Sequence, residues 1–383
     1  MISLLDYYTT KFGELWEKSL SDLIQEAVNG VLKSNKLNKK QIDAIFFANM
    51  LAGVLENNMH ISAKLAELIG LNIPIYRVEA ACASGGAAFS LANNYLNANS
   101  NKTVIVIGAE KMTDYSPEET TQALAGAASG EEQEAGLTFS GLYGMMANFY
   151  FEKYGCSEEN LAYVSVKNHF HGSLNEKAQF RNKITIDDVL QSPYVAHPLK
   201  VMDSAPISDG ASAVILSNNQ SIIKKSKCSI KVLSSQMIND TISLKSRKRP
   251  DEILATKIAA DKAFQESKLE RIDINVAEVH DCFSIAEILA LEDLGFWEKG
   301  QGGKKITENS TRWGSNSRLI INTSGGLKAA GHPVGATGIK QIGEIFLQLT
   351  GHATNRQVKK VRYGLAHNVG GSGGTAVVTI LAS

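Results

Sequence analysis

The sequence predicts an α/β protein built from two similar halves, with an inserted segment that interrupts the first half. Helical apolar spacing alternates with short buried strands in both halves of the 383-residue chain. Residues 42–50 (IDAIFFANM) can be laid over residues 274–282 (INVAEVHDC), and each half then offers a small-residue turn that leads into a helix, at 81–86 and 331–338. A duplicated α/β unit fits this pattern.

Each element follows from its own apolar pattern. In the first half we expect a helix, a buried strand, a second helix and a second strand, at residues 20–34, 42–49, 84–96 and 103–108. The inserted stretch is rich in Gly, Ala, Glu and aromatic residues, and its best helix is 142–154. Residues 208–217 are typical of a turn and a strand that could rejoin the first half. In the second half we expect a helix, a strand, a helix and a final strand, at 251–263, 274–280, 338–349 and 377–381.

Composition excludes several classes of function. The 39 basic and 39 acidic residues cancel, which argues against a general polyanion binder. No run approaches the roughly 20 apolar residues of a membrane helix. Residues 1–10 lack the basic, apolar and small-residue regions of a secretory signal, so we expect a cytoplasmic protein. Two basic runs, 224–227 and 245–249, and the HFH sequence at 169–171 are expected on the surface.

The cysteines give no sign of a metal or redox motif. They are far apart and form no CxxC pair, and they are Cys82, Cys156, Cys228 and Cys282. In a reducing cytosol they are expected to be free thiols, of which one or two could be reactive.

One reactive candidate is Cys82, in the sequence EAACASGG at 79–86. It lies at a predicted strand-to-helix junction among small residues that would let a bulky substrate approach. A helix N-terminus presents free N–H groups that lower the pKa of a thiol. Taken alone, however, the motif favours a buried structural cysteine, because free cysteines are often core residues.

Three further motifs suggest groups that could act with Cys82. The glycine-rich loop 325–338 carries His332, whose ordinary pKa near 6.5 suits deprotonation of a thiol. His280 and Cys282, in HDCF after a predicted strand, could donate to an oxyanion and shuttle a proton, although one His and one Cys are too few for a metal site. The turn 367–374 (HNVGGSGG) could point backbone N–H groups inward, as an oxyanion hole requires. Structural roles remain open for each motif.

The four motifs together resemble the thiolase superfamily. ACASG, HDCF, GHPxGATG and HNxGGxGG occur in this order over nearly the whole chain, along with GAEKMT at 108–113 and SDGA at 208–211. HDCF is similar to the sterol-carrier-protein-X type and its archaeal and bacterial relatives, in which the HDCF cysteine is the second thiol. Conventional thiolases have that cysteine near the C-terminus, where this chain has Asn368.

The resemblance implies a fold and roles for particular residues. The fold would comprise two βαβαβαββ halves in a five-layered α-β-α-β-α core with an inserted loop domain that covers the site and contacts coenzyme A. Cys82 would carry the acyl group, His332 would accept its proton, and Cys282 would move the proton at the α-carbon of the second substrate. His280 would donate to the thioester oxygen together with His332, and the backbone N–H groups of Cys82 and Gly370 would form the second oxyanion hole.

The implied activity is an acyl-CoA C-acyltransferase, either condensing acyl-CoA units or cleaving a 3-oxoacyl-CoA. Acyl-CoA would be the substrate, with no resident cofactor and no metal. Two alternatives stay open: a 3-oxoacyl-carrier-protein-synthase-like condensing enzyme, and a subunit active only with a zinc-ribbon/OB-fold partner. The resemblance also implies a homodimer or homotetramer without nucleic-acid partners. The expected domains are 1–115 with 197–225, the insert 116–196, and 226–383.

Overall fold

The computed structural model describes residues 2–35 and 37–383, so Met1 of the first expected domain lies outside the described residues. The first half follows a βαβαβαββ order. Its elements are β1 (Ser3–Thr9), α1 (Leu20–Asn35), β2 (Ala44–Ala48), α2 (Ile61–Ile69), β3 (Ile75–Val78), α3 (Ser84–Ala98), β4 (Thr103–Glu110) and β7 (Gly210–Ser217).

The second half repeats that order. Its main elements are β8 (Ile230–Asn239), α10 (Leu254–Ser267), β9 (Val276–Glu278), α11 (Ser284–Asp293), β10 (Ile320–Ile321), α13 (Val334–Thr350), β11 (Tyr363–Gly370) and β12 (Thr375–Ala382). Two short helices, α9 (Gln220–Lys225) and α12 (Gly302–Thr307), lie outside this repeat.

The sheet topology confirms the duplication. The strands run β10-β9-β11-β12-β8 in one half and β1-β7-β4-β2-β3 in the other, so each half orders its strands in the same way. The strands β2 and β9 occupy equivalent places, as the overlay of 42–50 on 274–282 predicts. The halves meet through β1 and β8, which pair at only two positions, Ser3 with Lys231 and Leu4 with Ile230.

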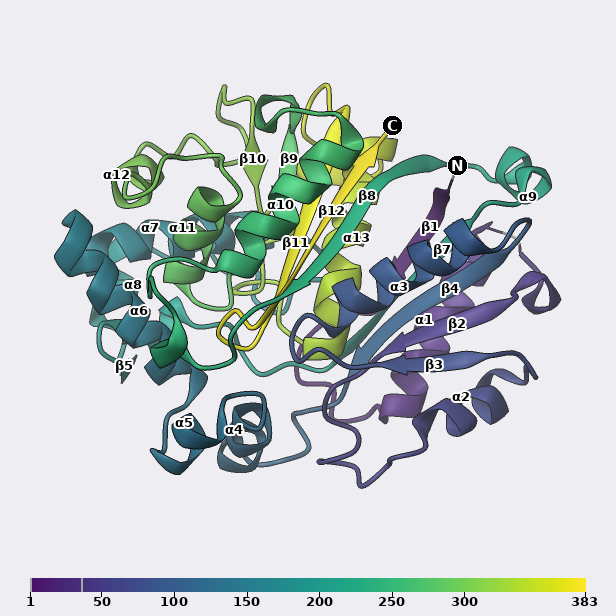
Figure 1. The fold of residues 1–383 in the computed structure, drawn as a ribbon, viewed down its shortest axis with the longest axis horizontal. Coiled ribbons are helices and arrows are strands. Elements are labelled where there is room, and N and C mark those ends of the chain that lie inside the picture. The colour runs from purple at the N-terminus through teal and green to yellow at the C-terminus, as the bar shows by residue number, and fades with distance from the viewer. Residues whose placement is uncertain (1, 36) are drawn as a thin grey trace.

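Five layers result from how the apolar side chains alternate along the strands (Figure 1). On β2, Phe46 packs toward the centre with α3 and α13, whereas Ile45 and Phe47 pack outward with α1 and α2. The strands of the two halves form one continuous ten-stranded sheet, and the part from the second half packs its outer face against α10 and α11. The central layer therefore consists of α3 and α13, one helix from each half.

The insert leaves the first half and packs on the second. It contains α4 (Pro117–Ala125), α5 (Gly130–Glu134), α6 (Phe139–Tyr154), α7 (Glu158–Ser173), α8 (Ile186–Gln191), β5 (Tyr194–Ala196) and β6 (Leu199–Lys200). In Figure 1 its teal helices lie beside α11 and α12. Tyr143 and Tyr150 of α6 share an apolar cluster with Ile285 and Leu289 of α11. We propose that the domain boundaries expected above follow this arrangement.

Every expected strand and helix forms, with shifted ends. The helix expected at 338–349 already begins at Val334, because the glycines of its first turns pack against neighbouring backbone instead of forming a loop. The helix expected at 251–263 begins at Leu254, because Asp251 instead accepts a hydrogen bond from Tyr154. Among the described helices, none is both long and apolar enough to cross a membrane.

Two surface expectations are wrong in part. His171 of the HFH sequence lies inside α7 and is fully buried, between the Asn322 carbonyl and the Trp313 N–H. In the second basic run, Arg247 is half-buried and donates to Ser372 in the C-terminal glycine turn. A periodicity pattern cannot distinguish a buried polar side chain that has partners from an exposed one.

The central helices touch backbone to backbone near their N-termini. A Cβ on Gly85 of α3 would lie 2.9 Å from the N atom and 3.0 Å from the Cα atom of Gly338 on α13. Such distances are shorter than real Cβ contacts, and a backbone cannot rotate away as a side chain can. The glycines of both expected turns are therefore needed for close packing.

We expect Gly85→Ala to lower the free energy of unfolding by about 1–3 kcal/mol, the usual cost of overpacking a rigid contact. Gly130→Ala is the matched control, since Gly130 is exposed in α5 and nothing lies within 4 Å of its added Cβ. Urea denaturation measures both. Equal midpoints for the two variants would show that the helix contact is looser than described.

Candidate active site

The four predicted side chains meet at one cavity of about 110 Å³. Cys82, His280, Cys282 and His332 all line it, although they come from four separate segments. The remaining lining residues are mostly apolar and include Met112, Leu124, Phe139, Tyr143, Ala205, Pro206, Ile207, Phe283, Val334 and Gly371. Two thiols and two imidazoles thus share a small space with mostly apolar walls.

Cys82 sits on a tight turn between β3 and α3. The preceding residue, Ala81, has φ +50°, a left-handed conformation that is uncommon for a residue with a side chain. The Ser84 hydroxyl holds the turn, because it accepts from the Ala80 N–H at 2.9 Å and donates to the Ala81 carbonyl at 2.5 Å. The small residues of ACASG therefore build a bend that presents the sulfur to the cavity.

The Cys82 thiol is not activated in the way the sequence suggests. Burial raises the pKa of Cys82 to about 12, although the backbone N–H groups of Gly371 and of Cys82 itself favour the thiolate. The sulfur is buried among mostly apolar side chains, so the cost of desolvating a charge exceeds the gain from these donors. The resting sulfur is consequently a neutral thiol, and it must lose its proton as the reaction occurs.

His332 is placed to take that proton. Its Nδ1 lies 2.7 Å from the Thr337 hydroxyl, which donates its own hydrogen to the Pro333 carbonyl at 3.0 Å. Because that hydroxyl has only one hydrogen, it must accept from Nδ1–H. The lone pair of His332 is then on Nε2. Burial lowers the pKa of His332 to about 3, well below its ordinary value, so the ring is neutral at pH 7.

His280 lies edge-on to His332, with ring centroids 5.2 Å apart. Its Nδ1 is 3.3 Å from the Asn368 side-chain nitrogen, and its buried Nε2 has no partner among the described residues. Burial and the neighbouring His332 hold the pKa of His280 well below its usual value, so this ring is also neutral. A free ring nitrogen in a closed cavity suits a group that bonds to the substrate.

Cys282 has a partner that the sequence did not suggest, Tyr143 of α6. The Tyr143 phenol lies beside the Cys282 thiol, and it donates its one hydrogen to the Gly371 carbonyl at 3.2 Å. Burial raises the pKa of Cys282 to about 12, and the phenol opposes that rise. Tyr143 lies in a helix far from every motif, so no local pattern identifies it.

The glycine turn after β11 also lines the site. Gly370 is the last residue of β11, and its Cα packs against the Ala80 carbonyl. Gly371, with φ +61°, lines the cavity, and its backbone N–H favours the Cys82 thiolate. The role expected for the Gly370 N–H stays a prediction, and Gly371 is a further backbone donor beside Cys82. His367 lies elsewhere, bonded to Thr256.

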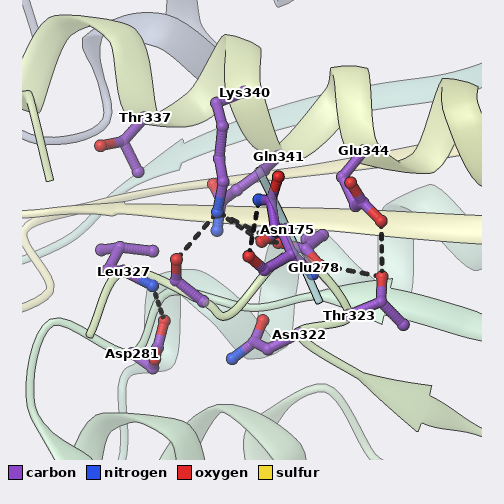
Figure 2. Close-up of polar contacts among 12 residues, drawn as sticks. Asn175, Glu278, Asp281, Asn322, Thr323, Leu327, Thr337, Lys340, Gln341 and Glu344 are labelled. Carbon is purple, nitrogen blue, oxygen red and sulfur yellow. Dashed lines mark hydrogen bonds and ion pairs between the residues drawn. The ribbon is translucent and has the colours of Figure 1, made fainter. Parts of the chain in front are cut away.

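A buried polar network fixes the HDCF segment to the glycine-rich loop (Figure 2). The Asp281 carboxylate accepts from the Leu327 N–H at 2.7 Å and from Asn168 at 2.7 Å. Gly326, with φ +62°, leaves room for that carboxylate. Lys340 of α13 reaches Glu278 at 3.4 Å, so the helix behind His332 is also tied to the strand before His280. These contacts set the spacing between the two histidines.

The motifs GAEKMT and SDGA also hold neighbouring segments together through buried carboxylates. Asp209 accepts from Lys111 at 2.6 Å and from the Met112 N–H at 2.7 Å, which joins the ends of β4 and β7. Glu110 accepts from the Leu51 N–H at 3.0 Å and the Gly335 N–H at 3.1 Å. Both carboxylates therefore hold segments that border the cavity.

Ligand atoms of Cys82, His280 and His332 lie within 4.8 Å of one another, a spacing that a metal ion could exploit. Each histidine, however, ligates a metal only through a nitrogen that carries no proton. Which nitrogen of His280 is protonated therefore decides whether these donors suit a metal. The four cysteines are free thiols.

Comparisons with known proteins agree with this geometry. The family described as "Thiolase, N-terminal domain" matches residues 4–220, and that described as "Thiolase C-terminal domain-like" matches residues 238–383. An acetyl-CoA acetyltransferase of Methanothermobacter thermautotrophicus is 44% identical over 99% of this chain and 98% of its own length. Human sterol carrier protein 2 is 34% identical over 80% of this chain and 58% of its own length.

Solved structures show the same fold. The structure of an Ltp2-ChsH2(DUF35) aldolase has a TM-score of 0.82 at 20% identity, over 100% of this chain and 97% of that one. Human mitochondrial 3-ketoacyl-CoA thiolase has a TM-score of 0.76 at 15% identity, over 100% and 98%. Matches to both halves and a full-length relative at 44% identity lead to one conclusion: the chain belongs to the thiolase family.

Proposed function

We propose that the protein is an acyl-CoA C-acyltransferase that carries the acyl group as a thioester on Cys82. The observation that carries this proposal is the shared cavity, where two thiols and two neutral histidines converge. A covalent thioester divides one difficult acyl transfer into two easier steps and requires one nucleophilic thiol. Carbon–carbon bond chemistry requires a separate acid or base, and the second thiol supplies it. The full-length match to acetyl-CoA acetyltransferases supports the same reaction.

In the first step the Cys82 sulfur attacks the thioester carbonyl of an acyl-CoA while His332 Nε2 takes the thiol proton. The N–H groups of Cys82 and Gly371 are positioned for the oxyanion that forms on the carbonyl oxygen. When the carbon–sulfur bond to coenzyme A breaks, the leaving thiolate takes the proton from His332. Because a charged thiolate is costly in this cavity, proton transfer and attack occur together.

In the second step the Cys282 thiol gives its proton to His332, which is neutral again after the first step, and the Cys282 sulfur takes a proton from the α-carbon of a second acyl-CoA. The negative charge moves to the thioester oxygen, to which His280 donates. The α-carbon attacks the acyl carbon on Cys82, a carbon–carbon bond forms, and the Cys82 sulfur leaves and takes the proton from His332. Thiolysis is the reverse reaction, with the same groups in opposite protonation roles.

The small volume of the cavity favours a short acyl group on Cys82. It measures about 110 Å³, and Phe139, Leu124 and Met112 line it. An acetyl group has two carbons and fits this volume beside the sulfur, whereas a long acyl chain exceeds it. We therefore propose acetyl-CoA C-acetyltransferase activity, with 3-oxoacyl-CoA thiolysis of short chains as its reverse.

We also propose a cytoplasmic homo-oligomer without a resident cofactor or metal. The Ltp2-ChsH2(DUF35) aldolase carries the names of two proteins, which supports retaining the alternative that this chain needs a second protein for full activity. A carrier-protein-dependent condensing enzyme is less well supported, since that alternative leaves Cys282 and its Tyr143 contact without a role.

Incubation with acetyl-CoA should add one acetyl group to the protein, on Cys82. In Cys82→Ala this label should be absent, whereas Cys282→Ser should be acetylated but fail to form acetoacetyl-CoA. Intact-protein mass spectrometry and a product assay measure both results. Label that persists in Cys82→Ala, or full condensation by Cys282→Ser, would refute the assigned roles.

Tyr143→Phe should shift the ionisation of Cys282 to higher pH. Below its pKa a thiol is alkylated in proportion to its thiolate fraction, which rises about tenfold per pH unit. When Cys282 ionises, the phenol hydrogen can turn from the Gly371 carbonyl to the thiolate. Since a hydrogen bond to a charged group contributes about 1.5–3 kcal/mol, losing the phenol should slow iodoacetamide labelling of Cys282 by about tenfold or more at any one pH.

The measurement uses peptide mass spectrometry in a Cys82→Ala background, so that only Cys282 reports from the cavity. Tyr150→Phe is the matched control, because Tyr150 is an equally buried tyrosine of α6 whose phenol binds Glu292 rather than a cysteine. Equal labelling rates for the two variants would contradict the role of Tyr143.

A further inference from the structure

The side chain of Asn368 is buried between the two halves of the site. Its Oδ1 accepts from the Gly86 N–H at 3.0 Å, and its Nδ2 donates to the Cys82 carbonyl at 3.0 Å. The same Nδ2 lies 3.3 Å from Nδ1 of His280. One amide thus contacts the nucleophile's turn, the first turn of α3 and a histidine of HDCF.

The orientation of this amide is fixed by its backbone partners. A backbone N–H can only donate and a backbone carbonyl can only accept. If Oδ1 and Nδ2 were exchanged, two donors would face each other at Gly86 and two acceptors at the Cys82 carbonyl. The group that faces His280 is therefore an N–H donor. A donor at that place requires an unprotonated Nδ1, which leaves the His280 proton on Nε2.

His332 has the opposite arrangement, because Thr337 requires its proton on Nδ1. We propose that Asn368 is a positioning residue that fixes His280 as the Nε2–H tautomer, so that His280 is a permanent donor and His332 is the base. This inference rests on the proposed function for its purpose, but the tautomer itself is a property of the resting protein. This tautomer also explains why the buried Nε2 of His280 has no hydrogen-bond partner among the described residues. Its N–H would donate to the thioester oxygen of the bound substrate.

The same tautomer decides how the cavity responds to metal ions. Cys82, His280 and His332 place three donor atoms within 4.8 Å, but an Nε2 that carries a proton has no lone pair for a metal. An Asp at position 368 loses the bond to the Cys82 carbonyl, but on the His280 side its carboxylate accepts from Nδ1–H and frees Nε2. Metal-binding histidines usually donate their second nitrogen to a carboxylate in this way. Asn368→Asp should therefore create a metal site.

The test uses Co²⁺ as the probe, because a cobalt–thiolate bond gives an intense ultraviolet charge-transfer band. Metal binding also requires release of the Cys82 proton, so the titration is carried out at pH 8. Asn368→Asp should show the band and bind Co²⁺ at least tenfold more tightly than the wild type. The band should disappear in Asn368→Asp combined with Cys82→Ala. An equally strong band in the wild type would overturn the proposal.

Gln341→Met is the matched control, since Gln341 is a buried amide of α13 that donates to the His367 carbonyl, one residue from Asn368. It should bind Co²⁺ no better than the wild type, and tighter binding would show that the effect does not depend on position 368. If Asn368→Asp does not fold by circular dichroism, nitrogen NMR of ¹⁵N-histidine-labelled wild type gives the answer directly.

The His280 signal, assigned by its loss in His280→Gln, should have the shifts of a ring protonated at Nε2. A ring protonated at Nδ1 would overturn the proposal. Neither readout requires turnover, so a protein without acyltransferase activity could still show the tautomer, and an active enzyme could still lack it.

Discussion

The backbone contact between α3 and α13 is the constraint on which the site depends. Gly85 and Gly338 let the two helices approach more closely than any side chain would allow. Cys82 lies just before one helix and His332 just before the other, so this contact sets the distance between the sulfur and its base. Each helix belongs to a different half, and the active centre therefore exists only where the duplicated units meet.

Burial then determines the chemistry. The cavity raises the pKa of both thiols to about 12 and lowers that of His332 to about 3, so every group is neutral at rest. Charge is disfavoured until substrate arrives, and the fixed donors are Gly371, the Cys82 N–H and His280. In such an arrangement the thiols react slowly with other electrophiles. They react readily only with a substrate whose oxygen can accept hydrogen bonds from those donors.

The sequence was sufficient to locate the elements and to bring together four side chains that line one cavity, while their reactive roles stay a prediction. Apolar periodicity located the core helices and strands, and the motifs around Cys82, His280, Cys282 and His332 brought the residues of one cavity into a single hypothesis. The direction of the thiol pKa was wrong, because a helix N-terminus is visible in a pattern whereas the depth of burial is not.

Other features depend on contacts that are distant in sequence. Tyr143 lies in an insert without a motif of its own, and its link to Cys282 exists only because α6 packs on the second half. Asn368 was noticed as the residue that replaces a cysteine, but its bonds to Gly86 and His280 could not be inferred from spacing. Likewise, Gly371 lines the cavity because the turn bends only after the strand ends.

The central claim is that α3 and α13 enclose one cavity in which Cys82 holds the acyl group. A crystal structure of the protein frozen after reaction with acetyl-CoA tests it most directly. The account predicts density for an acetyl thioester on the Cys82 sulfur, inside the 110 Å³ cavity, with its carbonyl oxygen facing the Gly371 N–H. Acetyl density on Cys282, or a Cys82 acetyl group that points out of the cavity, would contradict it.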